Sequence, residues 1–168
     1  PPGHRGTAGT TWLPCPPAAG GCAAVRGGTA VGQNNGFGMG FVDVDGDPAT
    51  FNSSRADLAL PPGASVLFAG LYWGGKTAAG GAPGAAAAPS LASIATVGLS
   101  SPGAAGYAPI AGAVVGTTTD NGANYQAFAD VTRLVSAAGP GTYGVSNVQV
   151  GRGTNTWGGW SLVVVHRD

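Results

Sequence analysis

The chain has 168 residues, which is enough for one domain with a hydrophobic core and too few for two. Only 8% of the residues are charged, the net charge is zero, and the chain has no Glu and a single Lys, Lys76. Its Arg residues are scattered singly, whereas a phosphate-binding surface needs clustered Lys and Arg, so nucleic acid is excluded as a partner. No apolar run approaches the length of a membrane-spanning helix, and we therefore expect no transmembrane segment.

Residues 1–30 form the first segment, which is rich in Pro, Gly and Thr and has no regular periodicity. We interpret it as an extended amino-terminal arm that precedes a single domain spanning residues 31–168. Cys15 and Cys22 enclose a stretch rich in Pro and Gly. An even pair of Cys in a His-poor chain favours a disulfide over a zinc site, with two free thiols as the alternative. A disulfide would tie down the arm and place the protein outside the reducing cytoplasm. The chain opens on Pro1 and not on Met, so we expect a processed form from which any export signal has been removed.

Strand patterns follow along the chain. Phe37, Met39 and Phe41 alternate with Gly, which predicts a strand with three large apolar groups on one face. A short strand is expected at residues 56–60, and residues 65–73, which are apolar at successive positions, predict a central strand covered on both faces. The segment 77–89 consists mostly of Ala, Gly and Pro without a pattern, so we expect a surface loop there. Further strands are expected at residues 90–99, 110–118, 141–150 and 160–166.

Residues 130–135 have a helical pattern, with Asp130 as the capping residue and Val131, Leu134 and Val135 spaced to share one face. The segment is short enough to be a connector between strands. Seven or more short strands punctuated by Gly and Pro, without a long helix, predict an all-β fold. We expect a two-sheet antiparallel β-sandwich of the jelly-roll type, preceded by the disulfide-tied arm.

Three of the seven acidic residues lie close together, at Asp43, Asp45 and Asp47, around Gly46. Alternate Asp side chains around a Gly that permits a sharp bend are a common way to surround calcium. We therefore expect a calcium site made by these three carboxylates, with a nearby carbonyl or the Asn52 side chain completing the shell. The alternative is a solvated turn in which the Asp side chains cap backbone amides.

Residues suited to catalysis are scarce. The His residues are His4, in the arm, and His166, near the end of the final expected strand, and neither has a recognisable partner for nucleophilic chemistry. The remaining Asp residues show no setting for a catalytic carboxylate pair. We therefore expect that the protein is not an enzyme. Exposed aromatic rings can stack on sugars, and Trp157, between Asn155 and a pair of Gly residues, is the best candidate for such a contact.

Four blocks of the sequence occur in an order typical of one family, at residues 43–54, 60–73, 125–135 and 158–165 (DVDGDPATFNSS, LPPGASVLFAGLYW, YQAFADVTRLV and GGWSLVVV). Over residues 31–168 the chain resembles the amino-terminal β-sandwich module of large secreted cell-surface repeat proteins of actinobacteria and related bacteria. The resemblance implies a secreted or cell-surface protein and supplies no catalytic residues. In such proteins the chain usually continues beyond the last block with more strands. We therefore expect that this sequence is a fragment, or that another chain completes the sandwich.

These features together favour an extracellular structural or adhesive subunit. Low charge, the extended arm and an unpaired final strand predict assembly with other copies, as a homo-oligomer or as a fibre built by exchange of the arm, or binding to cell-surface components. The alternative, from a different functional class, is a carbohydrate-binding module of a secreted protein, with Trp157 as its sugar contact.

Overall fold

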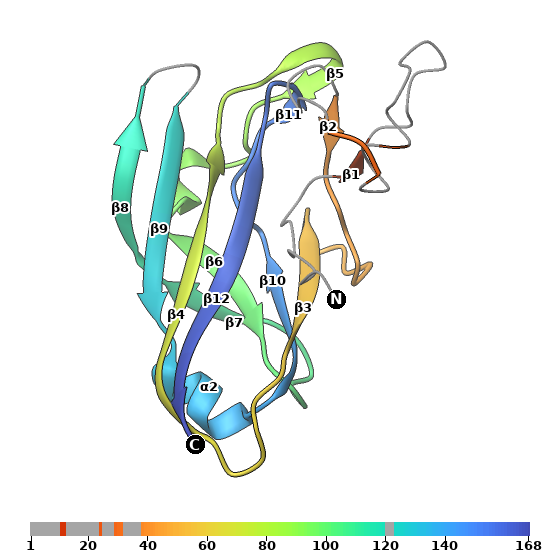
Figure 1. Cartoon of the computed structure of the whole chain (residues 1–168). Coiled ribbons are helices and arrows are strands. Elements are labelled where there is room, and N and C mark those ends of the chain that lie inside the picture. The colour runs from red at the N-terminus through yellow and green to blue at the C-terminus, as the bar shows by residue number, and fades with distance from the viewer. Residues whose placement is uncertain (1–10, 13–23, 25–28, 32–37, 120–122) are drawn as a thin grey trace.

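Two four-stranded antiparallel sheets pack face to face in the computed structural model of the chain, which describes residues 11–12, 24, 29–31, 38–119 and 123–168 (Figure 1). The front sheet in Figure 1 has the order β12-β4-β9-β8, with the bounds Gly158–Arg167, Ser65–Lys76, Asn124–Asp130 and Ala113–Thr118. The back sheet has the order β3-β10-β6-β7, with the bounds Ser53–Leu58, Gly141–Ser146, Thr96–Ser100 and Ala108–Ala111. The prediction of an all-β, two-sheet antiparallel sandwich is confirmed.

A smaller end sheet lies at the upper end of the molecule in Figure 1. It has the order β1-β2-β11-β5, with the bounds Thr11–Trp12, Met39–Gly40, Arg152–Thr154 and Gly81–Ala86. Strand β1 comes from the segment expected to be an arm, and it pairs with β2 of the same chain. Cys15 and Cys22 lie outside the described residues, so the disulfide stays a prediction.

The hydrophobic core lies between the front and back sheets. Residues of β4 and β9 that alternate along each strand turn inward from the front sheet, and they meet residues of β6 and β10 from the back sheet. The fully or nearly fully buried members are Ala69, Leu71, Trp73, Tyr125, Ala127, Val97, Leu99, Tyr143 and Val145. The indole nitrogen of Trp73 donates a hydrogen bond of 2.8 Å to the Ile94 carbonyl, so this large ring is buried without an unsatisfied donor.

The prediction that β4 is covered on both faces is wrong. The strand is central in the front sheet, between β12 and β9, and its inner face is buried, but its outer face is covered only in part. On the outer face Tyr72 is 40% exposed and Leu67 is 53% exposed. Leu67 stands at an irregularity in the pairing of β4 with β12, which turns its side chain outward. An apolar run therefore forms a strand with one covered face and one open face.

Several strands lie in segments whose residues carry no strand signal. Strand β5 falls in the Ala, Gly and Pro segment that was expected to be a loop, and β9 and β11 were not expected at all. The inward side chains of β9 are mostly small, because two of its three buried residues are Ala, so the alternation along the sequence is weak. Strand β2 covers two residues, so the strand expected around Met39 is shorter than the alternation indicated.

The expected short helix is present as α2, Thr132–Ala138, and it lies below the lower end of the sheets in Figure 1. The Asp130 carboxylate accepts a hydrogen bond of 2.9 Å from the Thr132 amide, so it satisfies one of the free amides at the start of the helix. Val135 is fully buried and anchors the helix to the core. A single turn of 3₁₀ helix, η2, covers Leu91–Ser93. Among the described residues, no helix is long and apolar enough to cross a membrane.

Candidate functional site

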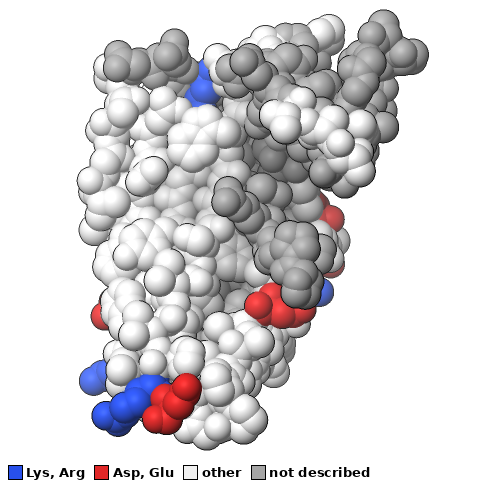
Figure 2. All heavy atoms as spheres, viewed as in Figure 1, with Lys and Arg blue, Asp and Glu red and all other residues white. Residues whose placement is uncertain are grey.

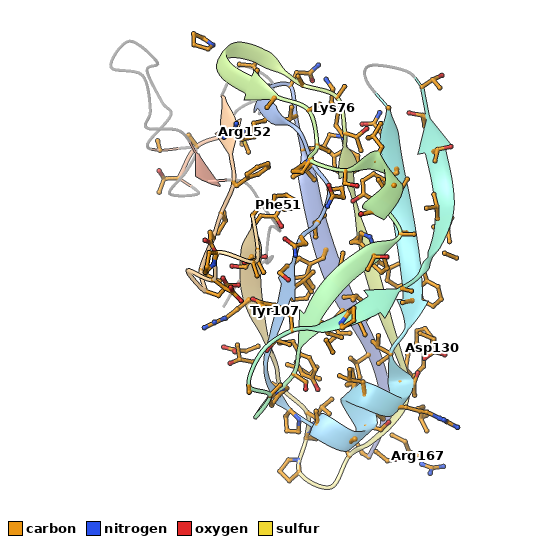
Figure 3. All side chains as sticks on the ribbon, turned by 180° about the vertical axis from the view of Figure 1, so that it is seen from behind. Phe51, Lys76, Tyr107, Asp130, Arg152 and Arg167 are labelled. Carbon is orange, nitrogen blue, oxygen red and sulfur yellow. The ribbon has the colours of Figure 1, made fainter. Side chains whose placement is uncertain are left out.

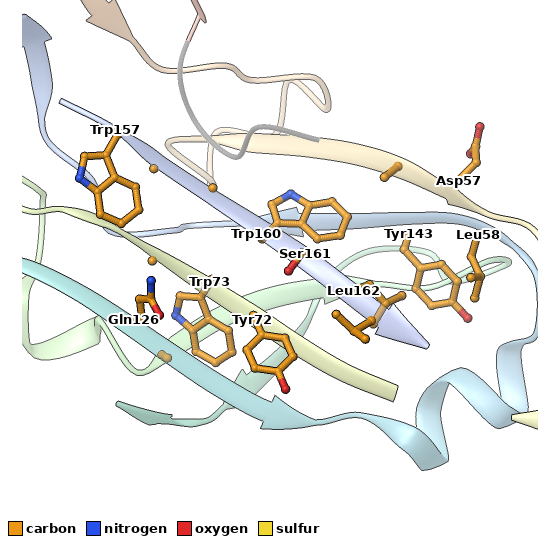
Figure 4. A pocket seen from close by; sticks show the side chains of 16 residues that line it. Asp57, Leu58, Tyr72, Trp73, Gln126, Tyr143, Trp157, Trp160, Ser161 and Leu162 are labelled. Carbon is orange, nitrogen blue, oxygen red and sulfur yellow. The ribbon is translucent and has the colours of Figure 1, made fainter. Parts of the chain in front are cut away.

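A hollow of about 840 Å³ runs along β12, on the side of the sandwich where this strand faces β3 (Figure 4). Part of the lining comes from the front sheet and includes the exposed Tyr72 and Trp157 and the inward Trp73. The rest includes residues 56–58 of β3 and Tyr143 of β10, and Trp160 lies between β12 and β3. The hollow exists because β12 and β3 are the edge strands of their sheets and do not pair with each other.

Trp157, the residue predicted to contact sugar, is 42% exposed and lines this hollow. Its indole nitrogen donates a hydrogen bond of 2.9 Å to the Asn124 side chain, and its carbonyl accepts one of 2.9 Å from the Lys76 amide. These contacts hold the ring at a fixed place beside the start of β12. Tyr72 is similarly exposed and its ring is tilted against Phe128, with 4.9 Å between the ring centroids. Sequence reasoning missed Tyr72 because it treated the whole of this strand as buried.

The outer face of the front sheet is apolar and open. Val163 and Val165 of β12 are 46% and 49% exposed, and the rings of Phe68 and Phe128 stack with centroids 6.4 Å apart. Among the described residues that Figure 2 leaves visible, the middle of this face is uncharged and the Lys, Arg and Asp side chains lie around its margins. Large contiguous apolar surfaces are uncommon on monomeric soluble proteins and mark binding surfaces.

The three aspartates of the predicted calcium site lie on one exposed loop, and their side chains bind the loop itself. Asp43 Oδ1 accepts a hydrogen bond of 2.9 Å from the Ser53 hydroxyl. Asp45 Oδ1 accepts one of 2.8 Å from the Asp47 amide, and Asp47 Oδ1 accepts one of 2.8 Å from the Ala49 amide. These hydrogen bonds are those of an aspartate-capped turn. Within the described part of the chain, no three His, Cys, Asp or Glu side chains are grouped to hold a metal ion, and calcium binding stays a prediction.

Asn52, the fourth expected calcium ligand, is fully buried beside this loop. Its Oδ1 accepts a hydrogen bond of 3.0 Å from the Val148 amide, and its Nδ2 donates one of 2.8 Å to the Val148 carbonyl. Both ends of the side-chain amide are therefore paired with the backbone of the segment that follows β10. The contacts give Asn52 a structural role in joining two segments that are distant in the sequence.

Near the loop, the pKa values of Asp45 and of Tyr107 (labelled in Figure 3) are shifted furthest from their ordinary values. Burial would raise the pKa of Asp45, but the hydrogen bonds that its Oδ1 accepts from the Asp47 amide and the Thr50 hydroxyl help to outweigh it, and the pKa lies well below 3.8. Burial, together with the nearby charge of Asp45, raises the pKa of Tyr107 to about 12. Asp45 Oδ2 and the Tyr107 hydroxyl nevertheless have no hydrogen-bond partner of ordinary geometry among the described residues.

Lys76, the one lysine of the chain, is 8% exposed. Its ammonium group donates a hydrogen bond of 2.9 Å to the Asn155 carbonyl. His166 lies at the other end of β12, where its Nδ1 is 3.1 Å from an Asp168 carboxylate oxygen. The Asp168 side chain is 75% exposed, so this pair is at the surface and does not form a buried acid and base.

Comparisons with known protein families, with curated proteins and with solved structures found no match to this chain.

Proposed function

We propose that the chain is an extracellular structural or adhesive subunit that associates with other copies of itself or with cell-surface components. The observation that carries the proposal is the open apolar face of the front sheet, on which Leu67, Tyr72, Val163 and Val165 are each between 40% and 53% exposed. Burying such a face against another molecule removes apolar surface from water and stabilises the complex. A net charge of zero leaves little electrostatic repulsion between copies.

Location outside the cell rests on two predictions from the sequence, the disulfide between Cys15 and Cys22 and the resemblance to secreted surface modules. Assembly by exchange of the amino-terminal arm also stays a proposal, because most of residues 1–30 lie outside the described residues. The test is to compare the intact chain with a variant lacking residues 1–22 by electron microscopy and by sedimentation velocity. Filaments that disappear on deletion support arm exchange, whereas unchanged filaments rule it out. If the intact chain stays monomeric at every concentration, self-assembly itself is wrong.

Carbohydrate binding is the second candidate, and the two exposed rings of the hollow favour it. Trp157 and Tyr72 present flat apolar surfaces, and the side chains of Gln126 and Ser161 add hydrogen-bonding groups in the same hollow. Pyranose rings bind to such combinations of aromatic and polar groups. We expect a glycan array to give hits that Trp157→Ala abolishes and Trp157→Phe weakens less.

The matched control for this experiment is Leu91→Ala, because Leu91 is 64% exposed on η2 and is not part of the hollow. An array without hits, or affinity for a polysaccharide that Trp157→Ala leaves unchanged, would remove this candidate. A folded variant must be shown by circular dichroism, since the indole also holds Asn124.

A further inference from the structure

The edge strands of the three sheets differ in how well they are protected from pairing with another chain. Each sheet has two edges: β1 and β5 in the end sheet, β3 and β7 in the back sheet, and β12 and β8 in the front sheet. An edge strand presents unpaired backbone amides and carbonyls, and natural proteins block such edges with short length, Pro, charges or bulges. A long edge without these features is therefore a place where a second strand can add.

Five of the six edges that the described strands form carry one of these features. Strand β1 has only two residues. Strands β5 and β7 contain Pro83 and Pro109. Strand β3 presents two exposed charged side chains, Arg55 and Asp57. Strand β8 has a bulge between Val114 and Gly116 in its pairing with β9. These edges are poor partners for another strand.

Strand β12 is the exception. It has 10 residues, contains no Pro, and carries no formal charge before Arg167. Its pairing with β4 is regular from Gly158 to Val165, and the one irregularity follows at His166. Its opposite edge borders the hollow and pairs with no strand in the described part of the chain. The sequence over this regular stretch is rich in β-branched and aromatic residues, which favour extended structure.

We propose that β12 pairs with β12 of a second copy, antiparallel and about a two-fold axis, so that the two front sheets become one continuous sheet. The inference rests on the proposed function, because it names the surface through which copies associate. A two-fold contact of this kind uses the same patch on both copies and closes to a dimer. Each copy would supply backbone partners for the edge of the other.

In such a pair the inward side chains of one β12 face the inward side chains of the other. Residues opposite each other in an antiparallel pair point to the same face, so inward residues must meet inward residues. With Leu162 opposite Leu162 of the second copy, Trp160 meets Val164 and Ser161 meets Val163. Trp160, Leu162 and Val164 are the inward, partly buried residues of the strand and pack against the core. Aromatic and β-branched residues facing each other stabilise a strand pair.

The charges of β12 also favour the antiparallel arrangement. Arg167 is the one residue of the strand with a fixed charge, and it lies at the end of the strand. In the antiparallel pair centred on Leu162 the two Arg167 residues are about 34 Å apart, because each lies five residues from the centre and each residue of a strand rises about 3.4 Å. A parallel pair would place them side by side, and like charges opposite each other destabilise a sheet.

The experiment measures self-association of the intact chain by sedimentation equilibrium over a wide concentration range. The test variant is Val163→Lys, because Val163 points outward, is 46% exposed and makes no part of the core. In the proposed register the two introduced Lys residues are diagonal neighbours about 7 Å apart along the sheet, and their like charges repel, so we expect the dissociation constant to rise about tenfold. The matched control is Val115→Lys, on the opposite edge of the same sheet and 60% exposed, which should leave the constant unchanged.

A charge-reversal mixture makes the test specific for the pairing. Val163→Lys and Val163→Glu should each associate weakly alone, and an equimolar mixture should restore association. Backbone amides of residues 158–165 should exchange more slowly with deuterium as the protein concentration rises, whereas those of β8 should not. If the Val163→Lys variant associates as tightly as the wild-type chain, the β12 pairing is wrong but self-assembly is not. Intact chains that never associate would overturn both.

Discussion

Replacing Asn52 with Ala should be among the most damaging single substitutions in this protein. The side chain is fully buried, and its amide makes one hydrogen bond of 3.0 Å and one of 2.8 Å to the backbone of Val148, which is itself fully buried. Ala at this position leaves the Val148 amide and carbonyl without partners in the core. Each buried and unsatisfied group costs about 1–3 kcal/mol, so we expect a loss of roughly 2–5 kcal/mol in the free energy of unfolding. That loss is a large part of a typical total of about 5–15 kcal/mol.

The assay is urea unfolding followed by tryptophan fluorescence. For a urea dependence of about 2 kcal/mol per molar, the expected loss moves the midpoint down by roughly 1–2.5 M. The control is Gln126→Ala, which removes an exposed amide side chain from the outer face of β9 and should change stability by no more than about 0.5 kcal/mol. If the urea midpoint of Asn52→Ala shifts from the wild-type midpoint by no more than the midpoint of Gln126→Ala does, the Asn52 hydrogen bonds do not contribute as we expect.

Other substitutions and conditions test further parts of the structure. A Cβ added at Gly75 would lie 2.4 Å from a methyl group of Val150 in the core, whereas a Cβ added at Gly159 would meet nothing within 4 Å. In thermal unfolding, Gly75→Ala should therefore lower the stability by about 1–3 kcal/mol, and Gly159→Ala should hardly change it. The low pKa of Asp45 stabilises the folded state above its ordinary value of 3.8, and this contribution is lost as the pH falls below that value. Urea midpoints between about pH 5 and about pH 2 should therefore fall more steeply in the wild type than in Asp45→Asn, and parallel profiles would contradict this. Calcium should raise the melting temperature and a chelator should lower it; curves unaffected by either would exclude the ion site on the aspartate loop. Alkylation of the native protein followed by mass spectrometry should leave Cys15 and Cys22 unmodified unless a reductant is added, and modification without reductant would exclude the disulfide.

The strongest strands could be predicted because the order of apolar and polar residues within each segment is itself typical of a strand. Strand β12 alternates inward Trp160, Leu162 and Val164 with exposed residues, and β4 is bounded by Gly and contains a continuous apolar run. The short helix could be predicted because Asp130 and the spaced Val and Leu residues are local signals. Strands β5 and β11 could not, because they contain mostly Ala, Gly and polar residues and are held by backbone pairing with distant strands.

The candidate site, too, could be predicted from the sequence only in part. Trp157 could be selected as exposed because the Gly residues around it predict a turn. The role of Asn52 could not be predicted, because its partner Val148 is 96 positions away in the sequence. The exposure of Tyr72 depends on which face of the front sheet another layer covers. The position of β12 at the edge of the sheet formed by the described strands likewise follows from the order of strands, which no single segment specifies.

The position of Lys76 makes the protein suited to measurements with chemical labels. This is the one lysine in the chain, its side chain is buried, and its ammonium group is held by the Asn155 carbonyl. Acylating reagents attack the free amine, so they can modify this residue only when that end of the sandwich opens. The rate at which a peptide containing Lys76 gains the label therefore reports the opening of the native state without any engineered probe. Surface immobilisation through lysine, for the same reason, will select molecules that have begun to unfold.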